Sequence, residues 1–191
     1  MVLMHMVRHL LLGAVAPPLV WLAASALPQP RWLLRRTTVG TFLTNPITSW
    51  LAAMLTVIGW HVPAAFDLAQ RSAVWHGIQD ASFFVTGLLF WWPVVRPWPA
   101  AERLPPGTIP LYLFAATLPC DALAAFLVFC DRVVYGHHLT DHHHSSTSAL
   151  ADQQTAGAFM WVSITFLYLI PAIVVMVQTL SPVQNRRVTV D

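Results

Sequence analysis

The sequence predicts an all-α protein, a polytopic membrane helical bundle with about five transmembrane helices in a single domain. Composition is the first reason, because 57% of the 191 residues are hydrophobic and only 9% are charged. Soluble domains carry about 25% charged residues. The second reason is the length of the apolar stretches, which reach the roughly 20 residues that a helix needs to cross a bilayer. The lipid bilayer is therefore the expected solvent for most of the chain.

The predicted spans follow one another without an internal repeat, at residues 4–27, 46–66, 73–95, 108–130 and 149–180. Pro17 and Pro18 lie inside the first span, where they should kink the helix while neighbouring helices satisfy the freed carbonyls. A short link with Asp67 and Arg71 is expected between the second and third spans. The last span is longer than one crossing requires, so its first turns should project from the membrane.

The arginines predict the orientation of the bundle, since all ten basic residues are arginine. Seven of them fall in the loops after the first and third spans and in the C-terminal tail, which share one side; three fall on the other. The positive-inside rule puts the N-terminus outside and the C-terminus in the cytoplasm. A net charge of +2 gives no indication of a nucleic-acid partner.

The histidines are distributed unevenly, because all nine fall at or near the predicted non-cytoplasmic face. His5 and His9 open the first span, His61 closes the second, and His76 opens the third. The other five occupy the loop before the last span, at positions His137, His138, His142, His143 and His144.

The spacing of these residues favours metal binding. His5 and His9 are four residues apart, so both imidazoles project from one helix face. His76 and Asp80 repeat that spacing with a nitrogen and an oxygen donor. Imidazole with carboxylate suits zinc, copper or iron, and imidazole with thioether suits Cu(I). The predicted metal ligands are His5, His9, His61, His76, Asp80 and Asp152. These donor types leave the metal open at this point, with copper as Cu(I) and zinc both compatible with them.

Several further residues are candidates with an ordinary structural alternative. Met6 is a candidate thioether ligand or a plain apolar residue. Cys130, at the outer end of the fourth span, is either a thiolate ligand or an inert small side chain. Asp121, in the middle of that span, is either functional or hydrogen-bonded to a neighbouring helix. His142, His143 and His144 are either a metal-gathering arm or part of a solvated loop.

The motifs resemble the multi-span CtaG family of bacterial cytochrome c oxidase assembly proteins, which is distinct from the single-span copper chaperone of the same name. The matching segments are His5–Leu11 with Ala16–Pro18, Trp60–Pro63 with Phe66–Asp67, His76–Phe84 with Gly87–Pro93, and Asp152–Gln154 with Ala156–Gly157 and Met160–Trp161. They occur in order over most of the chain. The sequence departs from the family pattern at Asp80, where a second histidine is usual, and in its histidine-rich loop.

The resemblance implies a non-enzymatic copper-binding factor of the bacterial cytoplasmic (inner) membrane. Such a factor would pass Cu(I) by ligand exchange to a subunit of a haem–copper oxidase, with an extracytoplasmic copper chaperone as a candidate donor and a homo-oligomer as a candidate state. Three alternatives stay open: a copper permease that uses Asp121 and Cys120, a membrane metalloenzyme with a zinc-loaded His/Asp site, and a structural partner whose histidines contact haem or quinone.

Overall fold

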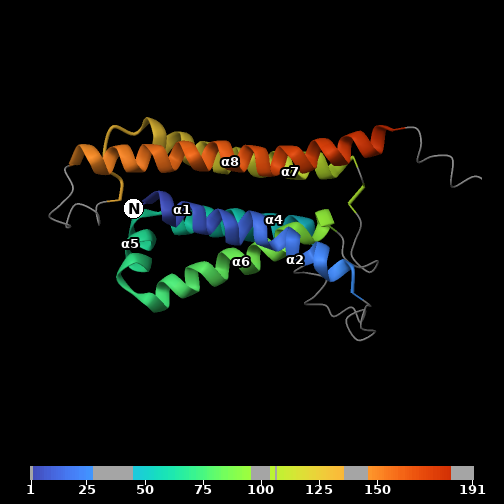
Figure 1. Cartoon of the computed structure of the whole chain (residues 1–191), viewed down its shortest axis with the longest axis horizontal. Coiled ribbons are helices and arrows are strands. Elements are labelled where there is room, and N and C mark those ends of the chain that lie inside the picture. Colours follow the sequence, from blue (N-terminus) through green and yellow to red (C-terminus); the bar gives the residue numbers. More distant parts are fainter. Residues whose placement is uncertain (1, 28–44, 96–103, 106, 136–145, 182–191) are drawn as a thin grey trace, which may run out of the picture.

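The computed structural model describes residues 2–27, 45–95, 104–105, 107–135 and 146–181, and the regular structure in these ranges is helical. The elements are α1 (Val2–Leu10), η1 (Leu11–Val15), α2 (Ala16–Ser25), α4 (Pro46–His61), α5 (Pro63–Arg71), α6 (Ala73–Val95), α7 (Thr108–Phe129) and α8 (Ser146–Leu180). Figure 1 shows α7 and α8 running together beside α1, α4 and α6, with α5 across one end. This arrangement confirms the predicted helical bundle.

Four helical segments in the described ranges are long and apolar enough to cross a membrane, and the bent pair α4–α5 makes a fifth if it counts as one span. The outer surface of these segments is rich in exposed large apolar side chains, such as Leu55, Phe114 and Phe166. Lipid is the solvent that tolerates such a surface. The buried core lies between the helices, where Phe90 stacks on Tyr112 with ring centroids 4.9 Å apart.

The prolines of the first span have a different effect from a simple kink. Pro17 and Pro18 lack the N–H groups that would bond the carbonyls of Gly13 and Ala14. The turn that precedes α2, which carries both prolines, is a π-helical segment, η1. Gly87 of α6 packs against the freed Gly13 carbonyl so closely that a Cβ at Gly87 would lie 2.5 Å from that oxygen. The π-helical segment and α6 therefore pack closely against each other at this point.

The second span departs from the prediction of a continuous helix over residues 46–66 followed by a link. The helix breaks at Val62, and residues 63–71 form α5, which is bent by 76° from α4. The cause is local, since the residue before a proline avoids helical dihedrals, and Val62 is extended with φ −63° and ψ 130°. The break makes His61 the last residue of α4 and lays α5 over that end of the bundle.

The last helix begins at Ser146, three residues earlier than predicted. Its 35 residues correspond to a rise of about 52 Å at 1.5 Å per residue. That length exceeds the hydrocarbon thickness of about 30 Å. The helix is thus longer than one crossing requires, as the sequence predicts.

Candidate metal centre

His5 and His9 of α1 lie together with His76, which belongs to the first turn of α6. The ring centroids of His5 and His9 are 4.0 Å apart, and those of His5 and His76 are 5.5 Å apart. His5 and His9 are buried, whereas His76 is half-buried. The four-residue spacing in α1 therefore places both imidazoles on one face, as predicted, and the packing of α6 adds the third.

Asp80 completes this group, one helical turn after His76. Its Oδ1 lies 4.0 Å from Nε2 of His9, and its Oδ2 lies 3.9 Å from Nε2 of His76. A metal with bonds of about 2.0–2.1 Å to nitrogen and oxygen can join two donor atoms that lie at most about 4.2 Å apart. Both Asp80 distances are within that limit. We call His5, His9, His76 and Asp80 the histidine cluster.

Arg8 contacts the histidine cluster, although the sequence motifs did not predict it as a site residue. Its guanidinium forms an ion pair with Asp80, and its Nη1 donates to Nε2 of His76 over 2.9 Å. Because a guanidinium only donates, Nε2 of His76 must be the acceptor, and the proton of the neutral ring sits on Nδ1. The signal was available in the sequence, since an arginine inside an apolar helix requires a partner.

His9 is the residue of the histidine cluster whose polar side-chain atoms have the fewest hydrogen-bond partners among the described residues. Its ring stacks on Phe83, with centroids 4.2 Å apart, and is 6% exposed. Within the described residues, neither ring nitrogen of His9 has a hydrogen-bond partner. Buried polar atoms without partners are costly and uncommon. The cluster therefore presents nitrogen donors that a bound cation or water would satisfy.

Helix α5, which follows the bend at Val62, contacts the histidine cluster through His5. Gln70 of α5 contacts Nδ1 of His5 through its side-chain nitrogen at 3.1 Å, and the Phe66 ring packs edge-on against His5. Phe66 in turn stacks on Tyr135, whose hydroxyl donates to the backbone carbonyl of His61. Burial raises the pKa of Tyr135 above its ordinary value, so that the hydroxyl keeps its proton at neutral pH.

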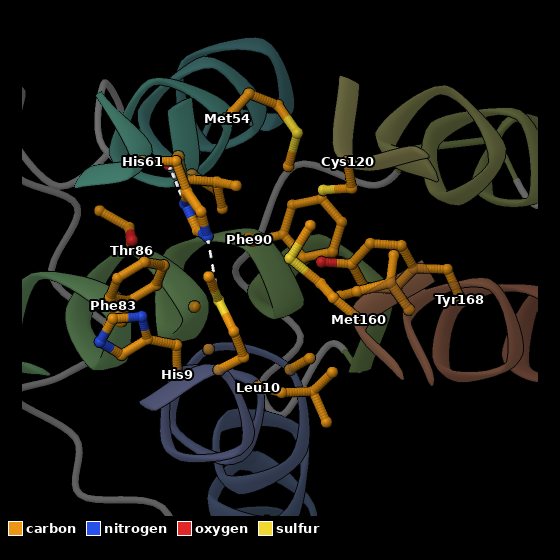
Figure 2. A pocket seen from close by; sticks show the side chains of 17 residues that line it. His9, Leu10, Met54, His61, Phe83, Thr86, Phe90, Cys120, Met160 and Tyr168 are labelled. Atoms are coloured by element: carbon orange, nitrogen blue, oxygen red, sulfur yellow. Dashed lines mark hydrogen bonds between the residues drawn. The ribbon is translucent and has the colours of Figure 1, made fainter. Parts of the chain in front are cut away.

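His61 lies at the same end of the bundle but has different partners. Its Nδ1 contacts the Val57 carbonyl at 2.7 Å, and its Nε2 lies 3.3 Å from the sulfur of Met6. Figure 2 shows both contacts as dashed lines beside a cavity that His9 also lines. The four histidines predicted at one depth are thus near one another, while His61 is turned toward Met6.

The remaining predicted residues occupy other positions. The Asp152 carboxylate accepts the backbone N–H of Val2 over 2.7 Å, which ties α8 to the start of α1. Asp121 accepts a hydrogen bond from Thr165, so it joins α7 to α8. Cys130 is a free, half-buried thiol directly after α7. The loop histidines at 137, 138 and 142–144 lie outside the described residues.

The donor types of the histidine cluster fit copper or zinc. In the described residues, no three His, Cys, Asp or Glu side chains are positioned to hold one metal ion together. Arg8 explains part of this, because its guanidinium occupies the Asp80 carboxylate and the free nitrogen of His76. Binding of a metal would require Arg8 to move and the imidazoles to rotate.

Comparison with known proteins supports the reading of the motifs. An uncharacterized protein of Mycobacterium bovis and one of Mycobacterium tuberculosis are each 32% identical over 204 residues, covering 96% of this chain and 30% of their own length. An uncharacterized protein of Mycobacterium leprae is 26% identical over 205 residues, covering 97% of this chain and 31% of its own length. The chain thus spans less than a third of these relatives. No solved structure matches it.

The family profile described as cytochrome c oxidase caa3 assembly factor matches residues 1–181. It covers every motif on which the resemblance was based. The chain belongs to the Caa3_CtaG family of cytochrome c oxidase caa3 assembly factors.

Proposed function

We propose that this chain binds Cu(I) in the histidine cluster and delivers it to a haem–copper oxidase during assembly. The observation that carries the proposal is His9, a buried imidazole with two unbonded nitrogens among the described residues, set between His5 and Asp80. A protein has little reason to bury such a group unless a ligand satisfies it. Membership of an oxidase assembly family supports copper as that ligand.

The charge of the cluster suits a cation. Asp80 is the acidic member, and its side chain is 13% exposed, whereas the Arg8 side chain is 55% exposed. Arg8 can therefore swing toward solvent or lipid headgroups while Asp80 stays in place. An incoming cation would replace the guanidinium as the partner of Asp80 and would free Nε2 of His76 as a donor. The buried charge of Asp80 remains compensated throughout this exchange.

Release by ligand exchange follows from the location of the cluster. It lies near one end of the bundle, which the arginine distribution predicts to be the extracytoplasmic end. A copper-accepting subunit of the oxidase can approach there without moving the ion across the membrane. A chaperone on the same side is the expected donor, and the protein needs no catalytic step for this role.

The direct test is metal binding by the purified full chain under reducing conditions, in competition with a Cu(I) chelator. We expect about one Cu(I) bound through nitrogen and oxygen donors in the histidine cluster, with the affinity of that site lowered at least tenfold in His9→Asn and Asp80→Asn. Asp121→Asn is the matched control, because it neutralises a carboxylate between α7 and α8 and should leave the affinity unchanged. Equal loss of this nitrogen- and oxygen-ligated copper in all three variants, or its retention in all three, would contradict the proposal.

Two further measurements separate the other functions. Stoichiometric zinc that survives reducing conditions would favour a metalloenzyme. Copper transport into proteoliposomes that stops with Asp121→Asn would favour a permease. In the host bacterium, oxidase that assembles with its full copper content in the absence of this chain would exclude the assembly role.

A further inference from the structure

A second group of metal-binding side chains lies deeper in the bundle, around a cavity bordered by α1, η1, α4, α6, α7 and α8. The cavity leaves about 50 Å³ for a guest of the size of water. One water needs about 10–15 Å³ on that measure. Its walls carry sulfur from four places in the sequence, namely Met6, Met54, Cys120 and Met160. We call it the sulfur cavity.

The sulfur atoms are selectively gathered here. Met6, Met54 and Met160 are three of the six methionines in the chain, and each is buried. By contrast, Met4 and Met176 are more than half exposed on the outer surface. Figure 2 shows Met54, Cys120 and Met160 around the cavity, each reaching it from a different helix. Methionine often fills gaps in cores, but gap filling does not require that the sulfurs converge on one open space.

The contact between Met6 and His61 adds a chemical argument. Nδ1 of His61 contacts the Val57 carbonyl, which only accepts, so Nδ1 carries the proton of the neutral ring. Nε2 then presents a lone pair, and it faces the thioether sulfur of Met6, another acceptor, at 3.3 Å. Two electron-rich atoms thus face each other with no proton between them. A cation is the partner that both atoms lack.

The distance between these atoms suits a metal. Bonds of about 2.0 Å to nitrogen and about 2.3 Å to sulfur enclose an angle of about 100° across the 3.3 Å that separates them. That angle is compatible with trigonal or tetrahedral coordination. Met54 or Met160 would supply a third donor. Thioether ligands select soft ions, and a buried site of neutral donors tolerates one positive charge better than two.

We propose that the Met6–His61 pair, which lines the sulfur cavity, is a second, soft-metal site, distinct from the histidine cluster and specific for a monovalent ion of the Cu(I) type. The identification of that ion as copper rests on the proposed function; the preference for a soft monovalent ion does not. His9 lines the cavity and also belongs to the histidine cluster. It therefore connects the two sites, so that an ion can pass between them by exchange of ligands.

The test uses the full chain in detergent with Ag(I) as a redox-inert probe, followed by Cu(I) under reducing conditions. X-ray absorption distinguishes sulfur from nitrogen ligands around either ion. We expect sulfur scattering in the wild type and its loss in Met6→Leu, with soft-ion affinity lowered at least tenfold. Met6→Leu nearly conserves volume, so the fold should survive. Met176→Leu, at an exposed methionine, is the matched control and should behave as the wild type.

The two proposals fail in different ways. In His9→Asn with Asp80→Asn, the sulfur-ligated ion should remain even if the histidine cluster binds nothing. An ion coordinated by nitrogen and oxygen alone in the wild type, or identical binding by Met6→Leu and Met176→Leu, would overturn the soft-metal site while leaving the histidine cluster untouched. Binding of Zn(II) in the sulfur cavity as tightly as Ag(I) would also overturn it.

Discussion

Arg8 forms an ion pair with Asp80 inside the histidine cluster, and its other terminal nitrogen donates to His76. One guanidinium thus occupies two of the groups that we propose as metal donors. This makes Arg8 an internal competitor of the metal. It also explains how a carboxylate can lie among apolar helices when no metal is bound, because the guanidinium neutralises it.

Arg8→Gln should therefore increase the affinity of the histidine cluster for Cu(I). A half-exposed ion pair contributes up to about 1 kcal/mol, which corresponds to an increase of about fivefold. Chelator competition measures the change, and Arg71→Gln on α5 is the control. Weaker binding by Arg8→Gln would mean that Arg8 orders the ligands instead of competing for them.

Gly87→Ala should destabilise the bundle at the contact between η1 and α6. The new Cβ would lie 2.5 Å from the Gly13 carbonyl oxygen and 2.8 Å from Cγ of Pro17. Overpacking of this kind costs about 1–3 kcal/mol. Thermal unfolding in detergent should show a lower midpoint. Gly77→Ala in the same helix meets nothing within 4 Å, so it should be neutral or raise the midpoint through better helix propensity.

Asp152→Ala should lower stability without weakening copper binding. The carboxylate accepts the N–H of Val2, and an anion at a helix N-terminus contributes about 0.3–1 kcal/mol. We expect a lower unfolding midpoint and Cu(I) affinity within a factor of two of the wild type. A tenfold loss of affinity at an unchanged midpoint would instead support the prediction from the sequence that Asp152 is a metal ligand.

Tyr135→Phe should reduce stability at neutral pH and change its dependence on pH. The hydroxyl donates to the His61 carbonyl, and losing such a bond costs about 1 kcal/mol. The pKa of Tyr135 is raised by burial, so its contribution is complete below the unfolded value of about 10. It is lost as the pH rises above that value. Unfolding midpoints between pH 7 and 11 should therefore fall less steeply in Tyr135→Phe. An identical slope in both proteins would contradict this prediction.

The spans and the i, i+4 pairs could be predicted because they depend on short-range physics. Hydropathy alone identifies segments that prefer lipid, and helical periodicity places His5 beside His9, and His76 near Asp80. The break after His61 was also accessible, since Pro63 disfavours a helical Val62. It was missed because the apolar run continues past the proline, and hydropathy carries no information on backbone dihedrals.

The sequence by itself determined that this chain is a helical membrane protein in which His5, His9, His61 and His76 lie near one end. Only the tertiary structure decided which of their atoms meet. Arg8 reaches Asp80, and His61 turns to Met6, because each helix has a particular rotation about its own axis. That rotation is set by close packing between helices, as where Gly87 meets the Gly13 carbonyl, because a single carbon added at Gly87 would change the fit. Such fits depend on residues distant in sequence, so no local pattern reveals them.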